Sequence, residues 1–199
     1  MLHSKSCLLL GNKRDTLKLK KIILKKKWNV VCKNKKITKK DLINIDLLIT
    51  FNYRLLLKKN ILRHLKRPAI NLHVSYLPFN RGCHPNFWSF VENSPKGVSI
   101  HEISKKVDKG PIIYRKKITF NINKKSNENF SKTYKILLSQ IQKLFSKNIN
   151  QILSRKYNIK KQRKNGSFHY RNELPKFMKN NWNIKIKDAL KIYTENKLN

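Results

Sequence analysis

An amide and an imidazole stand two residues apart, at Asn71 and His73, where a short apolar run ends. They lie near the start of residues 70–90, a stretch whose turns are fixed, as the geometry of a chemical site requires. Alternate residues of a strand share one face, so we expect both side chains to point the same way. An amide can donate to a carbonyl oxygen and an imidazole can move a proton. The pair is therefore suited to chemistry at a carbonyl carbon.

Asp108 offers a carboxylate as a third group, in a loop after an expected strand. An aspartate close to a glycine is ordinarily a turn residue, and a single Asn71 or His73 at a strand end is ordinarily structural. Taken together, the three side chains can polarise a carbonyl, transfer a proton and orient the base. Their combination points to catalysis more strongly than any one of them.

Strands that alternate with helices must position these groups. The sequence predicts a strand at residues 69–73 that follows the apolar runs at residues 6–10, 29–32 and 45–50, with helices at residues 15–28 and 55–65. This alternation indicates right-handed crossovers and a parallel sheet. Ligands of such sheets bind beyond the carboxyl ends of the strands, which is where Phe51, Asn52 and Asn71 fall.

The second half of the chain supplies fewer candidates for chemistry. It predicts helices at residues 87–92, 131–153 and 186–193, and strands at residues 98–103 and 111–120. His101 lies in the alternating strand, which favours a sheet-face or core histidine over a catalytic one. The glycine fingerprint that cradles a dinucleotide is missing, so the sequence does not support NAD or ATP binding.

Charge is the most unusual bulk property. The 199 residues include 47 Lys and Arg against 10 Asp and Glu, a formal net charge of +37. Such a charge suits nucleic acid, an anionic membrane surface or a polyanionic substrate. The alternative is compositional, because the lysines are spread through every segment rather than gathered on one tail or helix.

The length predicts one domain, and apolar runs far shorter than the roughly 20 residues of a membrane span predict a cytoplasmic protein. The three cysteines have neither the even number of a disulfide framework nor the spacing of a zinc site.

Residues 71–85 and 107–110 together resemble the folate-dependent formyltransferase family. The resemblance rests on Asn-Leu-His, Ser-Tyr-Leu-Pro, Arg-Gly and Pro85, followed by Val-Asp-Lys-Gly, in a core from about residue 46 to 118. It implies an α/β, Rossmann-like three-layer fold with a mostly parallel central sheet. Residues 1–155 would form the catalytic domain, with a compressed amino-terminal half, and residues 156–199 a basic extension packed on the same domain.

The resemblance also implies roles for individual residues and no metal. Asn71 would stabilise the oxyanion, His73 would handle the proton of the attacking amine, and Asp108 would orient His73 or a water. The formyl donor, 10-formyltetrahydrofolate, would contact Phe51, Asn52, Tyr53, Val107 and Gly110. The acceptor amine would lie near Tyr76, Arg81 and Trp88.

Several acceptors fit this resemblance, and an anionic small molecule is expected. The favoured acceptor is an amino sugar on a nucleotide carrier. Glycinamide ribonucleotide is the alternative suggested by residues 109–113, and methionyl-tRNA is another. Ser104, Lys105 and Lys106 replace the family's usual acidic residues before the aspartate loop, which also permits a degraded, RNA-binding homologue. A homodimer is compatible with each of these readings.

We predict that Asn71→Ala, His73→Ala and Asp108→Ala each abolish formyl transfer without unfolding the protein. Removing one oxyanion donor typically lowers the rate by roughly 10²–10³. The rate of tetrahydrofolate release tests the loss of activity, and a circular dichroism spectrum tests whether the variant is folded. Near-wild-type turnover in any of the three variants would contradict the assignment.

Overall fold

A six-stranded sheet forms the centre of the molecule, in the order β2-β1-β3-β4-β6-β7. The computed structural model describes residues 4–122, 126–163 and 165–198. The first four strands in this order are parallel, whereas β6 runs antiparallel to β4 and β7 antiparallel to β6. The strands are β1 (Ser6–Leu10), β2 (Asn29–Lys33), β3 (Leu47–Phe51), β4 (Ile70–His73), β6 (Gly97–Glu102) and β7 (Ile112–Lys117). The mostly parallel α/β fold expected from the sequence is confirmed.

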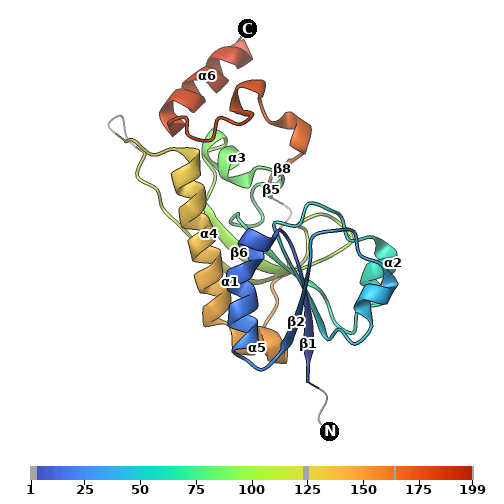
Figure 1. The fold of residues 1–199 in the computed structure, drawn as a ribbon. Helices are drawn as coiled ribbons and strands as arrows, with labels where there is room; N and C mark the ends of the chain where they lie inside the picture. Colours follow the sequence, from blue (N-terminus) through green and yellow to red (C-terminus); the bar gives the residue numbers. More distant parts are fainter. Residues whose placement is uncertain (1–3, 123–125, 164, 199) are drawn as a thin grey trace.

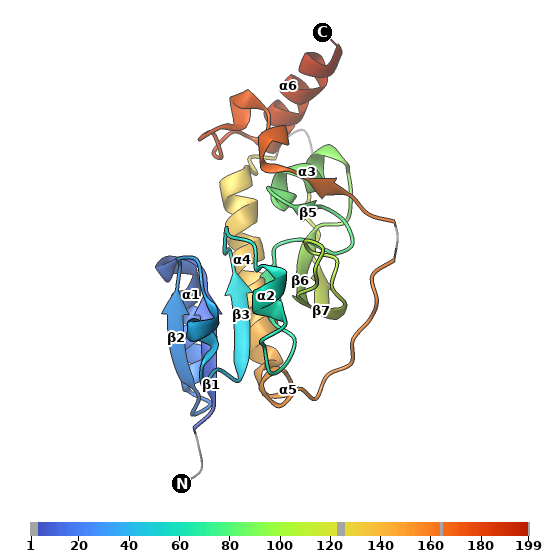
Figure 2. The ribbon, with the colours of Figure 1, turned by 90° about the vertical axis from the view of Figure 1, so that its right-hand side faces the viewer.

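Helices cover both faces of the sheet and make three layers (Figure 1, Figure 2). Helices α1 (Lys13–Leu24), α4 (Phe130–Lys147) and α5 (Ile149–Ser154) lie on one face, and the short α2 (Lys59–Leu62) lies on the other. The first face buries the larger apolar cluster, which includes Leu9, Ile49, Leu72, Ile100, Leu137 and Phe145. The second buries a smaller one that includes Leu8, Leu10, Leu48 and Ile61. Burial on both sides explains why the inner strands read as continuous apolar runs.

Two of the expected helices are shorter than their sequence patterns indicated. The helix expected over residues 131–153 is divided at Asn148, whose side chain donates to the Leu144 carbonyl oxygen at 2.8 Å and competes with the helical backbone. The helix expected over residues 55–65 is only α2, because Leu55 and Leu56 are exposed and provide no buried face to hold a longer one.

The last part of the chain packs beyond the carboxyl ends of the parallel strands, at the top of Figure 1. It contains β8 (Phe168–His169), two 3₁₀ turns (Arg171–Glu173 and Lys176–Met178) and α6 (Ile186–Leu198). Strand β8 pairs with β5 (Arg81–Gly82), and α6 contacts α3 (Pro85–Val91). A third apolar cluster joins these elements through Phe87, Trp88, Phe130, Met178, Ile186 and Ala189.

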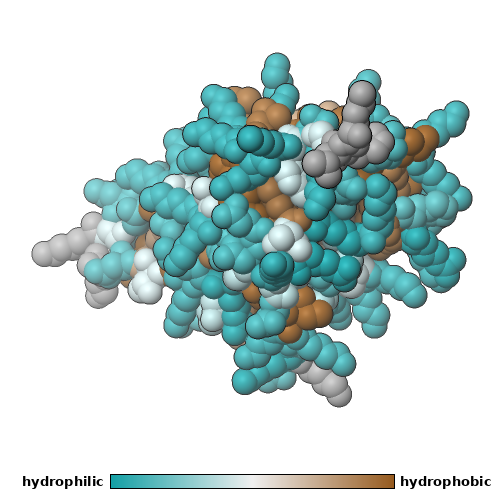
Figure 3. Space-filling view, turned by 90° about the horizontal axis from the view of Figure 1, so that it is seen from below, coloured by the Kyte–Doolittle hydropathy of each residue, from teal (hydrophilic) through white to brown (hydrophobic). Residues whose placement is uncertain are grey.

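The face of the molecule at which β1 begins is strongly hydrophilic. Seen from the end at which β1 begins, hydrophilic residues cover most of the molecule, and apolar surface is visible only between them (Figure 3). None of the helices in the described ranges is long and apolar enough to cross a membrane.

We predict that Gly11→Ala destabilises the protein by about 2 kcal/mol, because the backbone conformation and the surroundings of Gly11 both tolerate only glycine. Gly11 has φ +153°, and an added Cβ would overlap the carbonyl oxygen of Phe51. Urea unfolding measures the loss. Ser146→Ala, at an exposed position of α4, serves as the control and should change stability by less than about 0.5 kcal/mol. Equal stability of Gly11→Ala and the wild type would contradict the close approach of β1 to β3.

Candidate active site

Four side chains from three segments meet on one face of the sheet. Asn71 and His73 lie in β4, His101 lies in β6 directly opposite Asn71, and Asp108 belongs to the loop between β6 and β7. The neighbours of Asn71 and His73 in β4 face the other way, since Ile70 and Leu72 belong to the apolar cluster under α1 and α4. The shared face expected for Asn71 and His73 is therefore present.

The amide of Asn71 is held in one orientation. Its oxygen accepts a hydrogen bond from the Thr50 hydroxyl at 2.7 Å. Its nitrogen lies 3.2 Å from Asp108 Oδ1 and 3.1 Å from His101 Nε2. Because β3 supplies Thr50, the amide oxygen is engaged from inside the fold, and the NH₂ group points at the other polar groups.

Asp108 is the centre of the cluster. Its Oδ2 accepts the backbone N–H of Gly82 at 2.9 Å and lies 3.7 Å from His73 Nδ1, and its Oδ1 lies 3.4 Å from His101 Nε2. Burial by itself would raise the pKa of this carboxyl. The two imidazoles and the Gly82 N–H outweigh burial and hold the pKa well below its usual range. Asp108 is therefore ionised at neutral pH.

His73 is buried and uncharged at neutral pH. Burial lowers its pKa, with a further contribution from His101 and Arg81, and the opposing attraction of Asp108 is too small to compensate. Its Nε2 lies 3.3 Å from the carbonyl oxygen of Asn80, and its Nδ1 faces Asp108. A proton taken up by this ring would thus find an acceptor on each side.

Buried hydrogen bonds fix the loop that follows β4. The Ser99 hydroxyl donates to the Ser75 carbonyl oxygen at 2.7 Å, and Arg115 donates to the Leu77 carbonyl oxygen at 2.7 Å. Asn80 is completely buried, donates to Glu92 at 2.8 Å and accepts from Ser94 at 2.8 Å. The loop consequently presents the Asn80 carbonyl and the Gly82 N–H to the site in a fixed geometry.

The residues expected to contact the formyl donor lie on both sides of this cluster. Phe51 is fully buried in the core, so only its backbone can reach a ligand. Asn52 donates to Asp15 at 2.9 Å and to the Tyr134 hydroxyl at 3.0 Å, and the Tyr53 hydroxyl donates to the Lys35 carbonyl oxygen at 3.0 Å.

Val107 and Gly110 lie on the other side, in the aspartate loop. The side chain of Val107 is exposed. Gly110 packs so closely on the Glu102 carbonyl that a Cβ would overlap it. Any larger residue at position 110 would therefore move the loop that carries Asp108.

The residues expected to contact the acceptor are engaged within the protein. The Tyr76 ring lies 4.4 Å from the Arg115 guanidinium, and Arg81, which is 4% exposed, donates to Gln162 at 3.0 Å. Trp88 is 5% exposed and stacks on His169 with the ring centroids 4.1 Å apart. The structure brings Arg81 close to Asp108, whereas Trp88 belongs to the apolar cluster of the carboxy-terminal part.

Three contributors to the cluster were not anticipated as functional. His101 does lie on the sheet face, as the strand pattern indicated, but it also contacts Asn71 and Asp108. Its position opposite Asn71 follows from the antiparallel register of β6, which the sequence pattern does not specify. Thr50 and Gln162 lacked any signal, because each acts through hydrogen bonds to residues far away in the sequence.

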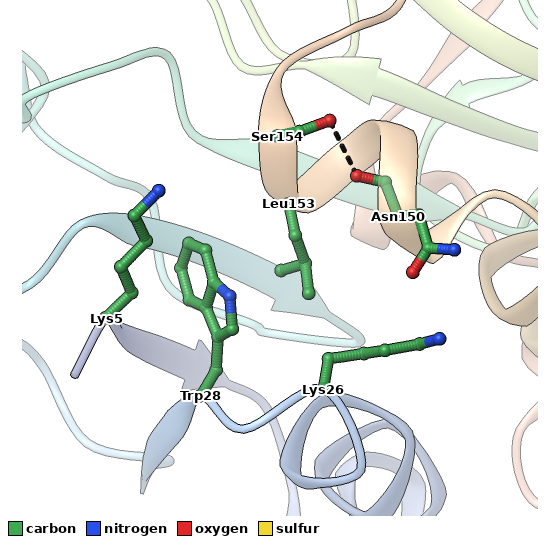
Figure 4. A pocket seen from close by; sticks show the side chains of 6 residues that line it. All are labelled: Lys5, Lys26, Trp28, Asn150, Leu153 and Ser154. Atoms are coloured by element: carbon green, nitrogen blue, oxygen red, sulfur yellow. Dashed lines mark hydrogen bonds between the residues drawn. The ribbon is translucent and has the colours of Figure 1, made fainter.

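A shallow pocket at the opposite end of the sheet has no comparable chemistry. It is lined by Lys5, Lys26, Trp28, Asn150, Leu153 and Ser154 (Figure 4). These six lining residues include no carboxylate and no imidazole. Among the residues that the structure describes, no group of three or more His, Cys, Asp or Glu is arranged to hold a metal ion.

An amide, two imidazoles and a carboxylate on a mostly parallel sheet define an α/β protein built for transfer chemistry at a carbonyl carbon. The chain belongs to the formyl transferase family, whose profile matches residues 5–147. The family resemblance drawn from the sequence is thereby confirmed.

One solved relative matches almost end to end. The formyltransferase PseJ of Anoxybacillus kamchatkensis, solved in complex with UDP-4,6-dideoxy-4-formamido-L-AltNAc and tetrahydrofolate, is 35% identical with a TM-score of 0.83, over 92% of this chain and 96% of its own.

Two curated relatives are similar over shorter regions. The bifunctional polymyxin resistance protein ArnA of Wigglesworthia glossinidia brevipalpis is 32% identical over 114 residues, which are 57% of this chain and 17% of that protein. The dTDP-4-amino-4,6-dideoxyglucose formyltransferase of Mycobacterium tuberculosis is 42% identical over 45 residues, 23% of this chain and 19% of that protein. The matches thus span less than a fifth of either curated relative.

We predict that His73 makes the stability of the protein fall with acidification. Its pKa is lowered in the folded state, so the unfolded chain binds a proton first, and stability declines as pH falls below about 6.5. The wild type should therefore lose more stability between pH 7.5 and 5 than His73→Gln does. Urea unfolding at both pH values measures the difference. A parallel decline in the two proteins would show that the ring is not buried in its neutral form.

Proposed function

We propose that this protein transfers a formyl group from 10-formyltetrahydrofolate to the primary amine of an amino sugar on a nucleotide carrier, in the cytoplasm. Residues 1–155 form the catalytic domain, and residues 156–199 are an extension packed on it. The observation that carries the proposal is the contact of Asn71, His73 and Asp108 on one sheet face. Support for the acceptor comes from PseJ, whose structure contains a formamido nucleotide sugar and tetrahydrofolate.

Asn71 supplies the oxyanion donor. As the acceptor amine attacks, negative charge develops on the formyl oxygen. An N–H group that already points at this oxygen stabilises the charge without having to reorient. Thr50 already holds the amide oxygen of Asn71, so the NH₂ group is the part that faces a ligand. It exchanges a hydrogen bond with His101 or Asp108 for one with the formyl oxygen.

His73 carries the proton between the two nitrogens. A bond forms between the acceptor nitrogen and the formyl carbon, and the bond from that carbon to the folate nitrogen breaks. The amine loses one proton and the leaving folate nitrogen gains one. His73 is neutral and therefore able to accept this proton, and the ionised Asp108 stabilises the imidazolium that results.

The two ligands approach the cluster from different sides. The formyl donor lies along Phe51, Asn52 and Tyr53 and against the loop of Val107 and Gly110, mainly through backbone groups. The site fits a folate in two respects. Fixed peptide groups flank the cluster on two sides, and the surplus of lysine suits a polyglutamate tail.

The acceptor lies on the side of Arg81, where Tyr76 and Trp88 support the wall of its binding site. Positive charge is available there for a diphosphate. Arg54 and Arg171 lie close enough to His84 to lower its pKa further, after burial, and the His84 ring stacks on Trp182 with centroids 5.5 Å apart. A flat, partly exposed ring pair beside two guanidinium groups suits a nucleotide carrier.

RNA is the second candidate ligand, favoured by the net charge of +37. In that reading methionyl-tRNA is the acceptor, or the chain binds RNA without catalysis. A steep dependence of binding on salt distinguishes this alternative, since each neutralised phosphate releases counterions. Whether the protein acts as a homodimer is decided separately, by its mass in solution.

The proposal predicts that the protein releases tetrahydrofolate when 10-formyltetrahydrofolate is mixed with a UDP- or dTDP-linked 4-amino sugar, and that mass spectrometry finds the sugar heavier by one formyl group. Tetrahydrofolate alone should raise Tm, because it binds only the folded state. His73→Gln is the matched control, which should keep the rise in Tm and lose turnover. Salt-sensitive RNA binding without any folate-dependent rise in Tm would instead support the RNA-binding reading.

A further inference from the structure

The first part of the carboxy-terminal extension runs beside the aspartate loop. In Figure 2 this segment, orange, rises from α5 past β6 and β7 to β8. The Tyr157 hydroxyl donates to Glu102 at 3.1 Å, and Lys160 exchanges two backbone hydrogen bonds of 2.8 Å with Ile112. Beyond it, β8 pairs with β5. The segment therefore contacts the strands on each side of the aspartate loop.

Gln162 lies in the middle of this segment and uses its whole amide. Its Nε2 donates to the Asp108 carbonyl oxygen at 2.7 Å and to the Gly110 carbonyl oxygen at 2.7 Å. Its Oε1 accepts from Arg81 Nε at 3.0 Å. One side chain thus joins the backbone on either side of Lys109 to the arginine that precedes Gly82.

The groups that Gln162 joins are the ones that orient the carboxylate of Asp108. Asp108 has a positive φ of 50°, a conformation that costs free energy for a residue with a Cβ and persists only where its surroundings enforce it. Its carboxylate meets the N–H of Gly82, which follows Arg81. Gln162 ties both ends of this contact, the aspartate backbone and the neighbouring arginine, to one amide.

We propose that Gln162 is a positioning residue, which holds the backbone of Asp108 so that its carboxylate points at His73, and that the carboxy-terminal extension thereby completes the active site. The proposal rests on the proposed function for its kinetic consequences, but not for its structural ones. Gln162 itself bonds to the backbone of the loop and acts through Asp108 rather than on either substrate.

Two substitutions separate the contacts of Gln162. Gln162→Met keeps the length of the side chain and removes all three hydrogen bonds. Gln162→Glu keeps an acceptor for Arg81 but replaces the donor to the two carbonyl oxygens. We expect kcat to fall at least about tenfold in both variants with KM changed less than about threefold, since a misplacement of about 1 Å can lower the rate about 10²-fold. Gln151→Met, at an exposed position of α5, is the control and should behave as the wild type.

The pH dependence supplies a readout that a simple loss of folding would not move. His73 is faced by Asp108, His101 and Arg81, and of these only Asp108 raises its pKa. A displaced carboxylate should therefore shift the acid limb of kcat, and the ring titration of His73 in an NMR spectrum, to lower pH in Gln162→Met. The His73 signal is assigned by its absence from His73→Gln.

The outcomes decide between distinct explanations. Unchanged kcat in Gln162→Met, or full activity in Gln162→Glu, would overturn the proposal, the second by showing that only the Arg81 contact matters. A loss of activity that follows the unfolded fraction, with the His73 titration unmoved, would overturn it as well. Should the wild type transfer no formyl group, the proposed function fails, yet the NMR titration still tests whether Gln162 positions Asp108.

Discussion

One buried carboxylate governs the arrangement of the site. Asp108 is ionised inside the protein, and an ionised group is tolerated there only when fixed donors replace the water that it has lost. Two of those donors come from separate segments, a backbone N–H from β5 and an amide from β4, and the His101 imidazole of β6 lies 3.4 Å from the carboxylate. Since each lies on a different element, the requirements of one carboxylate couple the loop after β4, the sheet register and the aspartate loop.

The protein tolerates so much positive charge because its lysines and its acidic residues occupy different kinds of position. Lysines can accumulate on a solvated surface, where salt screens their repulsion. The ten acidic residues are less free, because several hold parts of the fold together. Asp46 accepts from the Ser6 backbone and from Lys66, Glu92 accepts from Asn80 and His169, and Glu102 accepts from Tyr157. The acidic residues that this basic chain does carry thus include structural positions that lysine cannot fill.

The pattern of residues along the sequence predicted the part of the site that depends on local geometry. The two-residue period of a strand placed Asn71 and His73 on one face, and the apolar runs located the parallel strands. The pattern was insufficient for His101, whose partner depends on the antiparallel register, and for the short α2, where exposed leucines gave a misleading helical period. Gln162 follows Asp108 by 54 residues, and no periodicity connects positions so far apart.

The reversal of β6 makes the aspartate loop depend on outside support. Because β6 is antiparallel to β4, it ends at Glu102, opposite Ile70, at the end of β4 away from His73. The chain must then double back to bring Asp108 to Gly82. It does so against its own strand, where Gly110 packs on the Glu102 carbonyl without room for a Cβ, and Glu102 donates its N–H to Pro111 at 2.9 Å. A loop that returns this way gains two further hydrogen bonds from the extension beyond α5, through the Gln162 side chain.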